Sequence, residues 1–320
     1  MTHMIKKYWF FMGMAVMAGL AVALPEIGPV IKQYHILNIG IFLAFLLTGM
    51  SLETSSVLKQ IKDIRVLAAA LVSSLVFFPA AAFYAARFFL GAWPDFVMGA
   101  LIIGAAPVTV ASGTVMTAMA GGNVPLSLFI CILGNFAAIL TIPFMLNLIL
   151  AFDSTAIDLP ILQMLLGLML KVLLPTLIGQ VLRPRVKHRL ASHRTKISIF
   201  NQCIVLLIIL NALASSMESI LDVGPVLFLV LTFMVGLHVF MLVFNQYLAR
   251  FIGLDLPSIA AFTIHTSQKT LTVSYLVWAG YFAAAYPMAL IPAIVYHLTQ
   301  MIMDTFVAHR FGRVIRSRSS

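Results

Sequence analysis

The chain has 320 residues, of which 62% are hydrophobic and only 9% are charged, and its mean hydropathy is +1.06. These values lie far outside the range of soluble domains and indicate an integral membrane protein. The net charge of +10 does not indicate nucleic-acid binding, because the sequence contains no soluble basic domain that could carry it.

Ten apolar segments are long enough to cross the roughly 30 Å of hydrocarbon in a bilayer. Glycine and proline inside them are tolerated where neighbouring helices satisfy the freed backbone groups. We therefore predict an all-α integral membrane protein with ten transmembrane helices. In chain order the segments are residues 8–25, 36–52, 66–90, 95–120, 123–151, 160–183, 197–217, 224–249, 257–281 and 285–308.

The first segment also has features of a cleavable signal peptide. Lys6 and Lys7 precede it, and it ends in AVALPE, where Ala21 and Ala23 resemble a small-residue cleavage site. We favour a retained helix, because its removal leaves nine crossings and disturbs the distribution of charge between the segments.

The lysines and arginines are distributed unevenly between the two sides. Only Lys32 and Arg87 fall on one side, while Lys171 and Lys269 lie within segments. The bias predicts that both termini are cytoplasmic and that the protein is a multi-pass protein of the bacterial inner membrane. The sixteen basic residues on the cytoplasmic side are Lys6, Lys7, Lys59, Lys62, Arg65, Arg183, Arg185, Lys187, Arg189, Arg194, Lys196, Arg250, Arg310, Arg313, Arg316 and Arg318.

A shift of 162 residues superposes parts of the two halves of the sequence. It pairs Pro125 with Pro287 and Asn135 with His297, and it sets Pro107 against Lys269. A five-helix unit used twice enters the membrane from opposite sides, as in many secondary transporters. We predict two inverted repeats, residues 1–155 and 156–320.

The fourth and ninth segments are each interrupted near their centres. Pro107, Ser112 and Gly113 interrupt the fourth, and the sequence HTSQKT, residues 265–270, interrupts the ninth. Polar or unwound backbone persists at this depth only where it lines a cavity or is buried in protein. Facing breaks present helix N-termini that favour anions. The alternative is a pair of ordinary kinked helices.

Three motifs carry a resemblance to the bile acid:sodium symporter family over nearly the whole chain: APVTVASGTVMTAMAGGNVPLS from Ala106, HTSQKTL from His265, and YHLTQ from Tyr296. The resemblance implies crossed, discontinuous fourth and ninth helices. It implies a core domain of spans 3–5 and 8–10 that moves against a panel of spans 1–2 and 6–7. It also implies secondary active transport of organic anions, such as bile acids or small carboxylates and sulfates, by alternating access with Na⁺ or H⁺.

The resemblance also implies the site. The positions that match its sodium ligands are Ser112 or Thr114, Ser127 and Gln268, and Ser74 stands where a second glutamine is common. A divergent bacterial branch of the family resembles this chain in carrying QK at Gln268 and Lys269. The residues expected at the substrate and crossover site are Pro107, Thr109, Ser112, Gly113, Thr114, Asn135, Thr266, Ser267, Gln268, Lys269, Thr270 and His297.

The chain departs from the family at the acidic position. Ile264 stands where the family has glutamate, and Lys269 stands where asparagine is usual. We expect Lys269 to take the place of the cation, to attract an anion, and to bind and release a proton, with little dependence on sodium. The alternative is a lysine paired structurally with helix dipoles, or one that extends to the interface.

The remaining polar residues are expected to be structural. We expect His238, Lys171 and Asn211 to satisfy local partners or to lie near the membrane interfaces, and Asp304 to lie near the cytoplasmic end as a gate residue or a cap of the basic tail. Cys131 and Cys203 are expected to be buried apolar residues. No cofactor or metal is expected beyond Na⁺ as a coupling ion, since no cluster of metal ligands accompanies His265 and His297.

Two other classes of function compete with anion transport. A cation/proton antiporter on the same crossed-helix fold requires a membrane-embedded aspartate, and no acidic residue occurs between Asp95 and Asp153. An integral membrane enzyme would need a nucleophile paired with a general base, or a metal triad, and the sequence shows neither arrangement. The expected partners are the lipid bilayer and a small organic anion, with no obligate protein partner.

We predict that reporter fusions at Ser192 and after Ser320 both report a cytoplasmic location, because the basic residues gather on that side. The measurement is the activity of paired cytoplasmic and periplasmic reporters at each position. An external location at either position contradicts the arrangement of ten crossings and favours the cleaved signal peptide.

Overall fold

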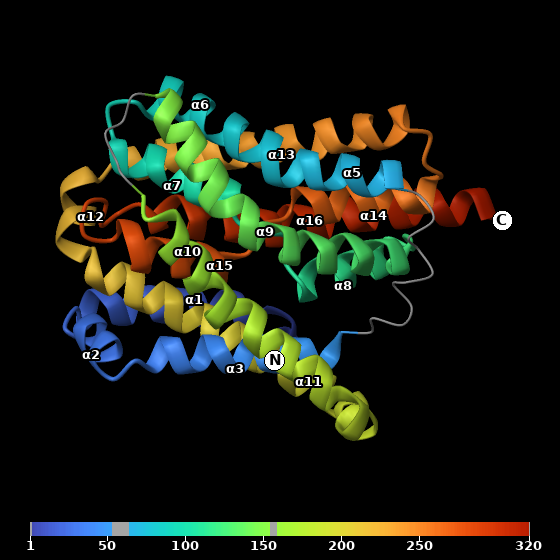
Figure 1. The fold of residues 1–320 in the computed structure, drawn as a ribbon, viewed down its shortest axis with the longest axis horizontal. Coiled ribbons are helices and arrows are strands. Elements are labelled where there is room, and N and C mark those ends of the chain that lie inside the picture. The colour runs from blue at the N-terminus through green and yellow to red at the C-terminus, as the bar shows by residue number, and fades with distance from the viewer. Residues whose placement is uncertain (1, 53–63, 154–158, 320) are drawn as a thin grey trace.

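The computed structural model describes residues 2–52, 64–153 and 159–319, and all regular secondary structure in these ranges is helical (Figure 1). Lys59, Lys62 and the predicted boundary between residues 155 and 156 lie outside the described residues. The helices are α1 (Thr2–Ala23), α2 (Ile27–Gln33), α3 (Ile36–Ser51), α5 (Ile64–Val72), α6 (Phe78–Leu90), α7 (Pro94–Ala105), α8 (Ala111–Met119), α9 (Val124–Phe152), α10 (Ile161–Leu168), α11 (Leu174–Ser215), α12 (Met217–Val223), α13 (Val226–Phe251), α14 (Leu256–Ser267), α15 (Leu271–Val277) and α16 (Leu290–Ser319).

Among the described residues, six helical stretches are long and apolar enough to cross a membrane, or seven if α1 and α2 count as one span bent by 102°. Helices α3 and α7 are apolar but shorter. The prediction of an all-helical membrane protein is confirmed. The arrangement of ten spans as an inverted repeat stays a prediction, because broken segments leave half-helices that are too short to span alone. The six stretches are Ile64–Leu90, Val124–Phe152, Ile161–Val186, Thr195–Ser215, Val226–Phe251 and Leu290–Ser317.

The observed helices differ from the sequence prediction in two places, one between two segments and one at the start of the last segment. The backbone between the segments 160–183 and 197–217 is helical throughout α11, where the sequence predicts a loop. The last segment, predicted to begin at residue 285, begins at Leu290 and extends to Ser319. Turns precede it at residues 287–289, where the Met288 backbone N–H donates to Asp95 Oδ1 at 2.8 Å.

The helices form two groups that pack among themselves. Helices α1, α2, α3 and α11 contact one another and lie along the lower edge of Figure 1. Helices α6 and α7, α13 and α14, and α16 with its neighbours form the second group above them. Helix α11 also contacts α15 and α16, so segments far apart in the sequence meet along the boundary between the groups.

The starts of α9 and α14 are built alike and contact each other. Asn123 caps α9 by accepting from the Leu126 backbone N–H at 3.0 Å, and Asp255 caps α14 by accepting from the Ser258 backbone N–H at 3.2 Å. The Asn123 backbone N–H also donates to Pro257 O at 2.9 Å. These contacts fix the N-terminal end of α14, which is the end away from the break that follows Ser267.

Helices α3 and α11 approach closely because glycines face the partner backbone. A Cβ atom on Gly49 would lie 2.3 Å from Thr176 O, and one on Gly179 would lie 2.3 Å from Leu46 O. Small residues at such positions allow the van der Waals contacts that hold membrane helices together.

We expect Gly49→Ala to lower the melting temperature of the detergent-purified protein, because a methyl group cannot fit against the α11 backbone without separating the helices. Overpacking of this kind costs about 1–3 kcal/mol. The matched control is Gly236→Ala in α13, where a Cβ meets nothing within 4 Å. Equal melting temperatures for the two variants would contradict the close approach.

Candidate functional site

The two interrupted segments meet at their breaks. The first break separates α7 from α8 and contains Pro107, and the second separates α14 from α15 and contains Lys269. The Thr270 backbone N–H donates to Pro107 O at 2.9 Å, so the two unwound stretches share a direct backbone hydrogen bond. Asn135 on α9 supports the first break, since its Nδ2 donates to Val108 O at 3.1 Å.

Gln300 of α16 holds the backbone of the second break. Its Oε1 accepts from the Lys269 backbone N–H at 2.8 Å, and its Nε2 donates to the Lys269 carbonyl at 2.8 Å. One amide side chain thus replaces both hydrogen bonds that a continuous helix would supply at this residue. His297, one turn earlier on α16, lies with its Nδ1 3.0 Å from Gln300 Nε2.

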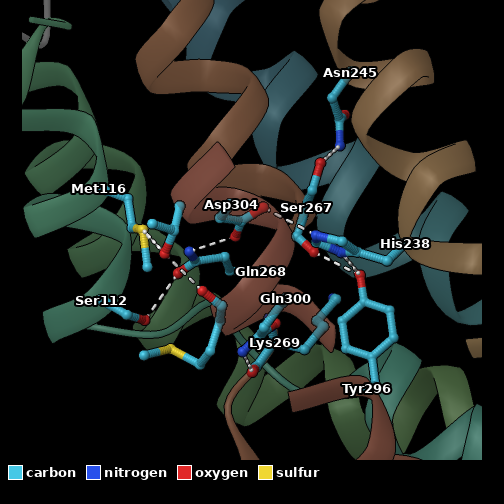
Figure 2. A network of polar contacts seen from close by, with 12 residues as sticks. Ser112, Met116, His238, Asn245, Ser267, Gln268, Lys269, Tyr296, Gln300 and Asp304 are labelled. Carbon is cyan, nitrogen blue, oxygen red and sulfur yellow. Dashed lines mark hydrogen bonds and ion pairs between the residues drawn. The ribbon is translucent and has the colours of Figure 1, made fainter. Parts of the chain in front are cut away.

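Gln268 connects the second break to the first break and to α16 (Figure 2). Its Oε1 accepts from the hydroxyls of Thr109 and Ser112, the latter at 3.0 Å. Its Nε2 donates to Asp304 Oδ2 at 2.6 Å. The side chain is fully buried, and protein groups bond both its oxygen and its nitrogen, as a buried amide requires.

The Lys269 ammonium lies at the junction of α7, the second break and the turn before α6. Its Nζ donates to Ser74 O at 2.5 Å, to Ser74 Oγ at 3.2 Å and to Ala106 O at 2.9 Å. It also lies 4.5 Å from the centre of the Phe78 ring. Three acceptors match the three donors of an ammonium group, and an aromatic face adds a cation–π contact.

Local backbone geometry explains why Ser74 O is free to accept from Lys269. Residues Ser73–Phe77 form a π-helical turn, in which the Phe78 backbone N–H donates to Ser73 O. The next residue is Pro79, which has no N–H. Neither neighbour can therefore donate to the Ser74 carbonyl, and the lysine supplies the missing donor.

Of the predicted sodium ligands, Ser74 contacts Lys269, Ser112 contacts Gln268, and Ser127 contacts His265. Ser127 Oγ lies 2.5 Å from His265 Nδ1 and accepts from Thr117 Oγ1 at 3.2 Å. A Cβ on Gly113 would lie 2.7 Å from His265 Nδ1, so only glycine leaves room for this ring. Thr114 instead donates to Val110 O in its own helix at 3.2 Å.

Two buried residues, Asp304 and His238, lie beside the second break, and His238 has local partners as expected. Asp304 was expected near the cytoplasmic end, but it is fully buried against Gln268, and its Oδ1 lies 2.9 Å from His238 Nε2. His238 Nδ1 lies 2.8 Å from the Tyr296 hydroxyl. The spacing of His297, Gln300 and Asp304 by three and four residues predicts that they share one helical face, and through Gln300 and Asp304 this face meets the second break.

A cavity of about 240 Å³ lies between the two groups of helices. Of the predicted site residues, Thr109, Ser112, Thr270 and His297 line it, whereas Gln268 and Lys269 are buried behind this wall. Thr266 donates to Phe262 O within its helix, and Ser267 accepts from Asn245 Nδ2 at 2.9 Å. The residues that line the opposite wall include Phe10, Phe45, Thr48, Ser198, Asn201 and Gln202.

Comparison with known proteins supplies the family. The model of the SBF-like CPA transporter family (DUF4137) matches residues 8–313, nearly the whole chain. This chain belongs to that family. The predicted family resemblance is thereby confirmed, and the protein is a membrane transporter and not an enzyme.

Curated relatives cover most of the chain at low identity. Sodium/bile acid cotransporter 7 of Xenopus tropicalis is 24% identical over 317 residues, which span 94% of this chain and 90% of the relative. The mouse protein of the same name is 24% identical over 314 residues, 94% of this chain and 91% of the relative. The probable sodium/metabolite cotransporter BASS4, chloroplastic, of Arabidopsis thaliana is 27% identical over 310 residues, 92% of this chain and 70% of the relative.

We expect Lys269→Met to lower the melting temperature and to abolish transport, because it removes the ammonium that donates to Ser74 O and Ala106 O. A buried acceptor without a partner costs about 1–3 kcal/mol. Lys269→Arg should fail as well, since a planar fork does not fit acceptors arranged around a compact ammonium. Thermal unfolding in detergent and uptake into liposomes measure the two effects.

The matched control is Lys171→Met. Lys171 also lies within an apolar span and in a π-helical turn, Met169–Leu173, but its side chain is exposed. We expect this variant to melt and to transport like the wild type. A Lys269→Met protein with the wild-type melting temperature would contradict the structural role of the ammonium.

Proposed function

We propose that this chain is a secondary active transporter for organic anions that works by alternating access. In this proposal the ten spans form two inverted five-helix repeats, residues 1–155 and 156–320. Spans 3–5 and 8–10 form a core that moves against a panel of spans 1–2 and 6–7, in the bacterial inner membrane with both termini cytoplasmic. The names of the relatives, which are sodium/bile acid and sodium/metabolite cotransporters, support cation-coupled solute transport.

The cavity between the helix groups is the observation that carries this proposal. One wall contains the crossover residues Thr109, Ser112 and Thr270, and the other contains side chains of α1, α3 and α11. Relative motion of the two groups would expose such a site to one side of the membrane and then to the other. A midplane site between two bodies is what alternating access requires.

The lining suits an amphipathic anion. Ser112 lies in the first turn of α8, where free backbone N–H groups favour negative charge. Gln202 and Ser198 can donate hydrogen bonds, whereas Asn201 Nδ2 donates to Thr48 Oγ1 at 3.1 Å, and Phe10 and Phe45 offer apolar contact. This combination favours a carboxylate or sulfate on an apolar body, from a small carboxylate to a bile-acid-like molecule.

The contacts of the predicted sodium ligands support a weak or absent dependence on sodium. Ser74 is bonded by the Lys269 ammonium, and Ser127 lies against the ring of His265. A sodium ion beside Lys269 would be repelled by several kcal/mol at low effective dielectric. Protons are therefore the favoured coupling ion, with Na⁺ as the alternative.

Cation/proton antiport is the second candidate, and one observation favours it. The membrane-embedded aspartate that such antiporters need is absent from the fourth and fifth spans, but Asp304 places a buried carboxyl group at the second break. The two candidates differ in whether an organic anion is carried.

We expect purified protein in liposomes to take up labelled pyruvate or cholate when an inward proton gradient is imposed. An equal inward Na⁺ gradient should stimulate uptake less than about twofold, because the cation position beside Ser74 is filled by Lys269. Empty liposomes and the Lys269→Met variant are the controls.

Two results would contradict this proposal. Cation flux against a proton gradient, with no uptake of either anion, would favour the antiporter. Saturable stimulation by Na⁺ with a Hill coefficient near two, as two bound ions would give, would show that paired sodium sites persist and that Lys269 does not replace them.

A further inference from the structure

A second cavity, of about 370 Å³, lies between α13, α14 and α16. Among the described residues, none of the side chains that line it lines the cavity at the crossover, so the two cavities are separate. Its lining extends along α13 from Val239 to Arg250 and along α16 from Met303 to Val314, eleven residues on each helix. Because a helix rises about 1.5 Å per residue, the cavity follows the two helices for about 16 Å.

The wall of this cavity is apolar along most of its length. Aliphatic, thioether and aromatic side chains such as Val243, Met303 and Phe311 form it. A length of about 16 Å is half of the roughly 30 Å hydrocarbon core, which is the thickness of one leaflet. A cavity of that shape suits an acyl chain, whereas it offers a small soluble anion no partner over most of its extent.

Two arginines line the cavity toward one end. Arg250 lies in the last turn of α13 and Arg310 in the later part of α16, and these two helices end on the same side of the molecule (Figure 1). Both side chains are exposed, and neither forms an ion pair within residues 2–52, 64–153 and 159–319. Arg250 lies over the ring of Tyr247, 6.0 Å from its centre, and tyrosines are enriched at membrane–water interfaces. Two positive charges without counter-ions therefore stand where the cavity meets the membrane surface.

Two uncharged donors line the cavity deeper than the arginines. Gln246 lies one turn before Arg250 and forms no hydrogen bond with the described residues. Thr263 lies two turns after the start of α14, and it is 1% exposed. Its hydroxyl has no partner in the described part of the chain. Buried hydroxyls are bonded in native proteins, so this one requires an acceptor that enters the cavity.

We infer that this cavity is a binding site for an anionic phospholipid. Arg250 and Arg310 bind the headgroup phosphate, which planar guanidinium groups recognise by paired hydrogen bonds. Gln246 and Thr263 donate to the ester carbonyls, which follow the phosphate along the lipid, and the apolar wall contacts one acyl chain. Basic pockets between membrane helices on the cytoplasmic side bind such headgroups, and the distribution of basic residues predicts that side for both arginines.

The charge of the site favours an anionic headgroup over a zwitterionic one. The cationic group of phosphatidylcholine would be placed beside two guanidinium groups, whereas phosphatidylglycerol carries no positive charge. Each basic residue near the surface strengthens the binding of an anionic lipid about fivefold, so two arginines supply about thirtyfold. A bound lipid also joins the ends of α13 and α16, which contact each other and α14. The inference concerns a lipid and holds whichever solute the protein carries.

The first test replaces both arginines, as Arg250→Gln with Arg310→Gln. The matched control is Lys196→Gln with Arg313→Gln, which removes two exposed charges outside the cavity and gives the same net charge. Native mass spectrometry of the delipidated full chain in detergent measures the binding of dioleoyl phosphatidylglycerol and of dioleoyl phosphatidylcholine. We expect the wild type and the control to bind phosphatidylglycerol about thirtyfold more tightly than phosphatidylcholine, and the first variant to bind both lipids equally.

The second test changes the apolar wall without changing the charge. Val243→Trp places a large ring at the edge of the cavity, and the valine is 46% exposed, so the fold tolerates the substitution. The control is Val181→Trp on α11, where the valine is 68% exposed and lies outside the cavity. We expect Val243→Trp to weaken the binding of phosphatidylglycerol about fivefold, since it displaces part of the acyl chain, and Val181→Trp to leave it unchanged.

Several results would overturn the inference. Wild-type affinity for phosphatidylglycerol in the Arg250 and Arg310 variant, or an equal loss in its control, would show that these arginines form no specific site. Equal affinity of the wild type for phosphatidylcholine would remove the role of charge. Displacement of the lipid by soluble glycerol phosphate at equal concentration would assign the arginines to a free phosphate. Melting temperatures without added lipid identify a variant that fails to fold, and unchanged binding by Val243→Trp would then decide against the site.

Discussion

The structure depends on satisfying backbone groups that two broken helices free inside the membrane. Each break leaves carbonyl and N–H groups where no water is available to bond them, and an unsatisfied group there is costly. Lys269 supplies donors to Ser74 O and Ala106 O, Gln300 bonds both sides of the Lys269 peptide, and Thr270 pairs with Pro107. The same side chains that satisfy the breaks also fix them relative to α6 and α16, and so they define the wall of the cavity.

Much of the fold was predictable from the sequence, because the signals were local. Apolar length gave the membrane helices, and Pro107 and the polar run HTSQKT gave the two breaks, which the structure places in contact. The helical backbone through the basic residues of α11 was not predictable from charge, since charge reports the side of the membrane and not the conformation. The turn before α16 is bonded to Asp95, which lies far away in the sequence, so no local pattern predicts this contact.

The site was harder to predict, because its contacts join residues from different helices. The sequence identified Lys269 as a charge in need of a partner, but its acceptors depend on the π-helical turn at Ser73–Phe77, and no local pattern predicts that turn. Asp304 was placed near the cytoplasmic end because the basic tail follows it. Its partner His238 lies 66 residues earlier, on a helix whose rotation only the packed structure reveals. Site residues with partners in their own helix, such as Thr266 and Thr114, do not face the cavity.

The Ser74 carbonyl couples two positions that lie far apart in the sequence, Pro79 and Lys269. It lacks a helical partner because Pro79 has no N–H, and Lys269 supplies one from across the bundle. A related chain with an ordinary residue at position 79 could satisfy this carbonyl within its own helix and would be free to lose the lysine. Substitutions at positions 79 and 269 should therefore be compensatory, so that the proline and the lysine tend to be inherited together.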